Sequence, residues 1–181
     1  MDGSAKPAGL IETEMATWAN YISEFISAYK AQGIDLWGNT VQNEPEYAAP
    51  WEACVYSPDY ERQFIVEHLG PLLRAKHPGL KILAYDHNKN DLVTWATAMY
   101  TDAAATKYVD GMAFHWYSGD QFYNVNTTHW LNPDKILLPT EGCNCPGVIK
   151  GDWSRAEHYG SCVRCFRCCC TACDRAPHHR P

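Results

Sequence analysis

Short apolar runs alternate with amphipathic helical segments along most of this chain, and this alternation limits the fold more than any other feature. Strands are expected over residues 34–41, 80–85, 109–117 and 135–140. Helices are expected over residues 15–31, 58–77 and 91–100, with a short helix or loop over 121–130. Such alternation predicts a parallel sheet whose strands are joined by crossover helices.

The helices are predicted from apolar spacing and from end signals. The first carries an apolar stripe at helical spacing, made of Trp18, Tyr21, Ile22, Phe25, Ile26 and Tyr29. Gly33 is expected to end it. Ser57 and Pro58 are typical of an N-cap and a first helical turn. A kink or break is expected at Gly70-Pro71, and Asp91 is expected to cap the third helix.

Two architectures fit this order of elements: a doubly wound sheet and a (β/α)8 barrel. No glycine-rich phosphate loop follows any expected strand, which argues against a nucleotide-binding sheet. A complete barrel takes roughly 250 residues. With 181 residues and four expected strands, the chain would hold about half of one. The expected fold class is therefore α/β, a partial (β/α)8 TIM barrel.

Composition excludes some functions. The chain is 46% hydrophobic and 20% charged, which is ordinary for a soluble globular protein. A net charge of −6 argues against a nucleic-acid surface. No apolar run has the length of a membrane span, and the first residues lack the regions of a signal peptide. Seven Trp and eleven Tyr suit a carbohydrate site, although for any single ring an aromatic core is the favoured interpretation.

The end of the chain differs in composition from the rest. Six of the nine cysteines lie in the last twenty residues: Cys162, Cys165, Cys168, Cys169, Cys170 and Cys173. This change predicts a boundary near Gly160, between a partial TIM-barrel domain over 1–160 and a Cys/Arg-rich tail over 161–181. The cysteine spacing fits neither a ferredoxin nor a zinc ribbon. A frame or splice artefact, or an incomplete gene model, is the preferred interpretation; metal binding and a disordered or disulfide-linked tail are the alternatives.

Two glutamates end expected strands: Glu44 in TVQNEP and Glu141 in LPTEGC. In a barrel these strand ends meet on the active-site face. Two carboxyl groups about 5 Å apart there are what a retaining glycosidase needs. One must be protonated and the other ionised. Position alone does not decide the matter, since a glutamate at a strand end is commonly a solvated residue.

The motifs around these glutamates resemble glycoside hydrolase family 30, in its glucosylceramidase (acid β-glucosidase, glucocerebrosidase) branch. They are TVQNEP at 40–45, SPDYERQFIVEHLGP at 57–71, VDGMAFHWY at 109–117, LPTEGC at 138–143 and DWSRAEHYG at 152–160. The similarity runs in order from about residue 2 to residue 160. It implies a fragment that covers barrel strands four to seven and lacks the remaining strands and the family's side domain.

The resemblance assigns roles to individual residues. It implies that Glu44 is the acid/base and that Glu141 is the nucleophile. Asn43 matches the residue that holds the sugar's 2-hydroxyl. His115 and Tyr117 match residues that line the −1 sugar site near the two carboxylates.

Three further features are candidates on weaker grounds. Asp86 and His87 follow an expected strand and are candidates to line the cleft. Trp51 is a candidate to touch a glucoside, with packing as the equal alternative. Asn126-Thr127-Thr128 is a glycosylation sequon, which supports a secretory route only mildly.

The implied function is hydrolysis of glucosylceramide to glucose and ceramide, in lysosomal or secreted form, without a cofactor or metal. For the full-length family the resemblance also implies peripheral lipid contact and an activator protein. A β-1,6-glucanase or a xylanase of the same family is the alternative. A non-catalytic glycan- or lipid-binding module and a metal-binding Cys-rich protein are alternatives from other classes. Because half of the barrel would be missing, little activity is expected from this chain by itself.

Overall fold

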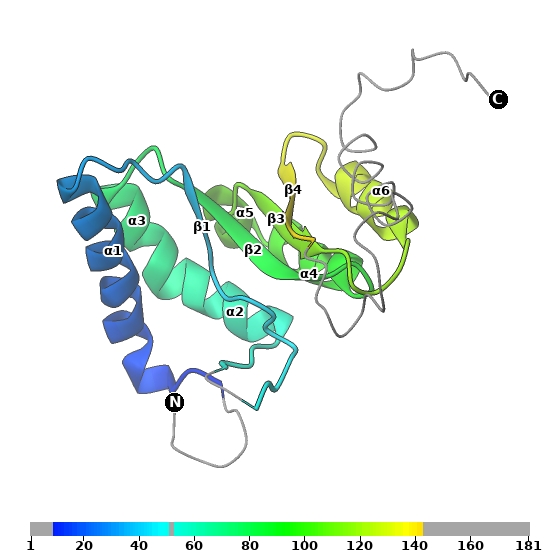
Figure 1. Cartoon of the computed structure of the whole chain (residues 1–181), viewed down its shortest axis with the longest axis horizontal. Helices are drawn as coiled ribbons and strands as arrows, with labels where there is room; N and C mark the ends of the chain where they lie inside the picture. The colour runs from blue at the N-terminus through cyan, green and yellow to red at the C-terminus, as the bar shows by residue number, and fades with distance from the viewer. Residues whose placement is uncertain (1–8, 51–52, 143–181) are drawn as a thin grey trace, which may run out of the picture. The chain divides into compact units, whose positions relative to one another are not determined.

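A four-stranded sheet with the strand order β1-β2-β3-β4 forms the centre of the protein (Figure 1). The strands are β1 (Gly38–Thr40), β2 (Lys81–Asn88), β3 (Gly111–His115) and β4 (Ile136–Glu141). β1 pairs with β2 and β2 with β3 in parallel. The predicted partial TIM barrel is therefore confirmed, as a parallel half-barrel of four strands with helices.

The computed structural model describes residues 9–50 and 53–142 of this chain. Contacts divide the chain into two compact units, residues 1–140 and 141–181. Of the second unit, only Glu141 and Gly142 are described. The boundary expected near Gly160, the Cys-rich tail and Trp51 lie outside the described residues.

Two helices precede β1, and the others occupy the segments between the strands. They are η1 (Glu12–Glu14), α1 (Met15–Ala31), α2 (Pro58–Phe64), η2 (Ile65–Leu69), α3 (Gly70–Lys76), α4 (Leu92–Tyr100), α5 (Ala103–Tyr108) and α6 (Phe122–Leu131). The sequence did not predict α5, whose six residues have no helical apolar period. Asp102 caps this helix by accepting the N–H groups of Ala104 and Ala105 at 2.8 and 2.9 Å.

The buried face of α1 is rotated from the stripe that the sequence predicts. Its buried side chains are Met15, Ala19, Ile22, Ser23 and Ile26. Tyr21, Phe25 and Tyr29, which belong to the predicted stripe, are exposed. Small and aliphatic side chains let α1 pack closely on η2 and α3. The aromatic rings contact each other instead, with ring centroids of Phe25 and Tyr29 4.7 Å apart.

The kink expected at Gly70-Pro71 begins earlier, as a π-helical turn in η2. Proline lacks an N–H group and its ring crowds the preceding turn, and a π turn is one way in which a helix absorbs this conflict. The segments α2, η2 and α3 therefore follow one another without a loop. The predicted N-cap is confirmed, since the Ser57 hydroxyl accepts the Tyr60 N–H at 3.2 Å. Asp91 precedes α4 but makes no side-chain cap hydrogen bond.

The core lies between the central strands and the helices, and it includes fully buried side chains of α2, η2, α3 and α4. Every residue of β3 is buried, as are residues 82–86 of β2. The apolar run before β1 is not part of the core, because Ile34 and Trp37 are 51% and 57% exposed. β1 is therefore shorter than the expected strand over 34–41.

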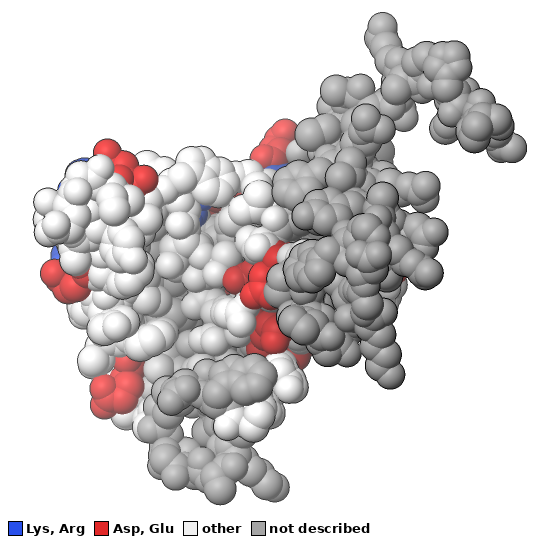
Figure 2. All heavy atoms as spheres, viewed as in Figure 1, with Lys and Arg blue, Asp and Glu red and all other residues white. Residues whose placement is uncertain are grey.

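Two properties of the described residues relate to the predictions made from composition, one of the helices and one of the surface. No helix within residues 9–50 and 53–142 has the length and apolarity that a bilayer crossing requires. On the face drawn in Figure 2, acidic side chains are more prominent than basic ones, in line with the net charge of −6.

Gly111 opens β3 where β4 approaches most closely, and the Ile136 N–H donates to the Asp110 carbonyl at 2.9 Å. A Cβ atom at position 111 would lie 2.6 Å from the Ile136 Cβ. We expect Gly111→Ala to push β4 away and to lower the free energy of unfolding by about 1–3 kcal/mol. Gly79→Ala is the control, since a Cβ there meets nothing within 4 Å. Equal urea midpoints for the two variants would contradict this prediction.

Candidate active site

β2 contains a bulge at the point where it reaches the candidate site. Tyr85 pairs with Ala113 and His87 with Phe114, so Asp86 is the extra residue. Tyr85 and Asp86 have φ angles of 76° and 60°, in the left-handed region. A non-glycine residue in this region lowers the folding stability by about 1–3 kcal/mol. Its backbone keeps this conformation only where the surrounding structure holds it in place. Bulges of this kind redirect side chains next to active sites.

Glu61 of α2 supports the bulge from the helical layer. Its Oε1 accepts the Tyr85 N–H at 3.0 Å, while its Oε2 is buried without a hydrogen-bond partner among the described residues. Burial, aided by the charge of Asp86, raises the pKa of Glu61 to about 8 although the Tyr85 N–H opposes it. Glu61 is therefore mostly protonated at neutral pH. It was missed from the sequence, although it lies on the same helical face as the buried Phe64 and Ile65.

Glu44 follows β1 and is itself held in the left-handed region, with φ 48°. Its backbone N–H donates to the carbonyl of the bulged Asp86 at 3.0 Å. Among the residues that the structure describes, only Glu44, Tyr85 and Asp86 combine a side chain with a φ angle in the left-handed region. The strained backbone is thus concentrated where the loop after β1 meets the bulge of β2.

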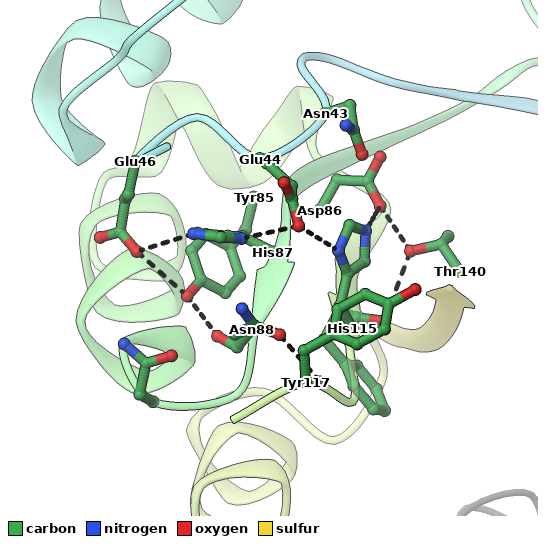
Figure 3. A network of polar contacts seen from close by, with 12 residues as sticks. Asn43, Glu44, Glu46, Tyr85, Asp86, His87, Asn88, His115, Tyr117 and Thr140 are labelled. Atoms are coloured by element: carbon green, nitrogen blue, oxygen red, sulfur yellow. Dashed lines mark hydrogen bonds and ion pairs between the residues drawn. The ribbon is translucent and has the colours of Figure 1, made fainter. Parts of the chain in front are cut away.

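His115, the last residue of β3, joins two carboxyl groups (Figure 3). Its Nδ1 lies 3.3 Å from Glu44 Oε1, and its Nε2 lies 3.2 Å from Asp86 Oδ1. The Thr140 hydroxyl of β4 also donates to Asp86 Oδ1. Burial alone would raise the pKa of Asp86, but hydrogen bonds from His115, Thr140 and Thr40 outweigh it and hold that pKa below its ordinary value.

This chain of contacts suits an acid/base residue. Because Asp86 is ionised, its hydrogen bond keeps a proton on Nε2 of His115. Nδ1 can then accept a hydrogen bond from protonated Glu44. This contact orients the protonated carboxyl group that a general acid requires.

A second imidazole faces Glu44 from β2. The Nδ1 atom of His87 lies 3.7 Å from Glu44 Oε1, and its Nε2 lies 3.9 Å from Glu46 Oε2. Burial lowers the pKa of His87, opposed by Glu44 and Glu46. Trp95 fixes Glu46 by donating its indole N–H to Oε1 at 2.8 Å. Asp86 and His87, candidates from their strand-end position, thus both lie beside Glu44; Glu46 was not predicted.

The other predicted residues are placed as follows. Asn43 precedes Glu44 on the same loop and is exposed (Figure 3). The Tyr117 ring meets the His115 ring edge-on at 5.9 Å, and the Tyr117 N–H donates to Asn88 Oδ1 at 2.9 Å. Glu141 is the last residue of β4 and belongs to the second compact unit. Its separation from Glu44 stays a prediction.

Comparison with known proteins identifies relatives of this chain. The family model described as "Glycosyl hydrolase family 30 TIM-barrel domain" matches residues 6–166. Putative glucosylceramidase 4 of Caenorhabditis elegans is 40% identical over 158 residues, which are 80% of this chain and 30% of the relative. Lysosomal acid glucosylceramidase of Mus musculus is 32% identical over 159 residues, 81% of this chain and 31% of the relative. This chain thus spans about 30% of the length of these relatives.

Solved structures are similar in fold as well as in sequence. The crystal structure of SrfJ from Salmonella typhimurium has a TM-score of 0.81 and 32% identity, covering 91% of this chain and 37% of that one. The endo-beta1,6-glucanase BT3312 has a TM-score of 0.69 and 33% identity, covering 75% of this chain and 31% of that one.

The protonated state of Glu61 predicts a pH dependence of stability. Its pKa rises from an ordinary value of 4.5 to about 8 on folding, so its stabilising contribution is complete below pH 4.5 and is lost as the pH rises through 8. Glu61→Gln keeps the acceptor for Tyr85 but cannot ionise. We expect the unfolding free energy of this variant, relative to wild type, to rise between pH 5 and 8 by on the order of 1 kcal/mol per pH unit.

Urea denaturation across this pH range measures the difference, because other titrating groups contribute equally to both proteins. Glu67→Gln, on the exposed side of η2, is the matched control and should show no such trend. A constant difference between Glu61→Gln and wild type from pH 5 to 8 would mean that Glu61 is ionised in the folded protein.

Proposed function

The chain belongs to the glycosyl hydrolase family 30 TIM-barrel family, and from this membership we propose that it carries the acid/base side of a retaining β-glycosidase site. The observation that supports the proposal most is the contact chain Glu44–His115–Asp86, with distances of 3.3 and 3.2 Å. It places a carboxyl group against an imidazole whose far nitrogen is held by an ionised carboxylate. Such an arrangement orients the protonated carboxyl group of Glu44, the form that a general acid needs.

The proposed reaction has two displacements. Protonated Glu44 donates its proton to the glycosidic oxygen while Glu141 attacks the anomeric carbon, so that the alcohol leaves and a glycosyl-enzyme forms. Ionised Glu44 then takes a proton from water, which attacks the same carbon and releases the sugar. A retaining reaction needs the two carboxyl groups about 5 Å apart, and this separation is part of the proposal.

We propose glucosylceramide, or a similar β-glucoside, as the substrate, with glucose and ceramide as products. The support is that two relatives at 40% and 32% identity are named glucosylceramidases. In this proposal Asn43 binds the 2-hydroxyl of the sugar, and the exposed ring of Tyr117 borders the same sugar. Since one relative is named lysosomal, we propose a lysosomal or secreted location for the whole protein. The proposed partners of the whole protein are a lipid surface and an activator protein.

A β-1,6-glucan is the second candidate substrate. The observation in its favour is the 33% identity with the endo-beta1,6-glucanase BT3312, close to that with the mouse relative. The two candidates differ in what leaves: a lipid alcohol in one case and a further sugar in the other. Hydrolysis of glucosylceramide but not of β-1,6-glucan, followed through all products of each substrate, would favour the first candidate.

We expect the purified chain to hydrolyse a fluorogenic β-glucoside weakly, since it spans about 30% of its relatives. Glu141→Gln should abolish this hydrolysis, because no glycosyl-enzyme can form. Glu44→Gln should lower it by about 10²- to 10⁴-fold for a glucoside with a poor leaving group, because removal of a general acid has this effect. The loss should be smaller for an activated leaving group, which needs no proton.

Exposed Glu67 provides the control, since Glu67→Gln should hydrolyse both substrates at the wild-type rate. A chain without any turnover, or one whose turnover survives both Glu44→Gln and Glu141→Gln, would overturn the proposal for this chain.

A further inference from the structure

His87 has a nitrogen that the proposed reaction does not use. The Nδ1 atom of His87 is buried and has no hydrogen-bond partner among the described residues. It faces Glu44, with 3.7 Å between Nδ1 and Glu44 Oε1. A buried imidazole nitrogen without a partner loses its hydration without compensation, so an occupant that binds it would be favoured.

Glu44, His87 and His115 offer one ligand atom each within 4.8 Å of one another. From Glu44 Oε1, the Nδ1 atoms lie 3.3 Å away in His115 and 3.7 Å away in His87. In a tetrahedral zinc site with bonds of about 2.0–2.1 Å, two ligand atoms lie about 3.3 Å apart. Two edges of the required tetrahedron are therefore nearly formed, and rotation of the His87 ring would shorten the third.

The carboxylate behind His115 favours the tautomer of that ring that binds metal. Asp86 Oδ1 lies 3.2 Å from His115 Nε2, and Glu46 Oε2 lies 3.9 Å from His87 Nε2. The proton held on Nε2 of His115 leaves a lone pair on its Nδ1, and the Nδ1 atoms of both histidines face Glu44 (Figure 3). A carboxylate on the far nitrogen is the usual partner of a metal-bound histidine.

We propose that Glu44, His87 and His115 form an inhibitory binding site for a divalent transition metal ion, best matched by Zn²⁺. Two imidazole nitrogens and one carboxylate oxygen suit zinc, with water as the fourth ligand. Mg²⁺ and Ca²⁺ prefer oxygen ligands alone and are not expected to bind. Because the ion takes the oxygen that must carry the catalytic proton, bound zinc suppresses the proposed glycosidase; this consequence, unlike the binding itself, rests on the proposed function.

The test is calorimetric titration of Zn²⁺ into the full chain after its cysteine thiols have been blocked with iodoacetamide. Wild type should bind one zinc ion, and His87→Gln should bind it at least about tenfold more weakly. The matched control is His129→Gln on α6, a half-buried histidine outside the cluster, which should bind like wild type. Mg²⁺ should give no binding heat.

A second measurement does not depend on the folding of a variant. In nitrogen-15 NMR spectra of the histidine rings of the wild-type chain, zinc should shift the resonances of His87 and His115 and leave those of His129 unchanged. No zinc binding by the blocked chain, equal affinity in His87→Gln, or unshifted His87 resonances would overturn the proposal. Since neither measurement uses substrate, a chain that binds zinc without turnover would contradict the proposed function and support this site.

Discussion

The bulge in β2 is the feature on which the candidate site depends. It turns the N–H of Tyr85 toward Glu61 and the carbonyl of Asp86 toward the N–H of Glu44. It also directs the Asp86 carboxylate to Nε2 of His115. One extra residue therefore connects a helix, the loop after β1 and the end of β3. A regular strand would place residue 86 in the ladder and leave Glu44 without this anchor.

Two carboxyl groups beside the bulge have opposite protonation preferences. Glu61 lies among apolar side chains with a single N–H donor, and burial raises its pKa to about 8. Asp86 is also buried, but three hydrogen bonds lower its pKa. The neutral form of Glu61 spares the site a second buried negative charge. The ionised form of Asp86 orients His115, and through it Glu44.

The fold was largely predictable, because the alternation of short apolar runs and helical stripes requires a parallel sheet. Strand-end positions also led to Glu44, Asp86 and His87, since parallel strands end on the same side of a sheet, whereas His115 was predicted from the family resemblance. The bulge was not predictable, because its residues Tyr85 and Asp86 are neither glycine nor asparagine, the usual signals of a left-handed backbone. The face of α1 was predicted wrongly, since aromatic residues beside the buried stripe shared its spacing.

The central claim is that the Asp86 carboxylate fixes the tautomer of His115 by accepting a hydrogen bond from its Nε2. Long-range nitrogen–proton NMR spectra of the histidine rings measure this directly. The account predicts a proton on Nε2 of His115 in wild type at every pH at which the chain is folded, and loss of this preference in Asp86→Asn. A neutral His115 protonated on Nδ1 in wild type would contradict it, because Glu44 could not then donate its proton to that nitrogen.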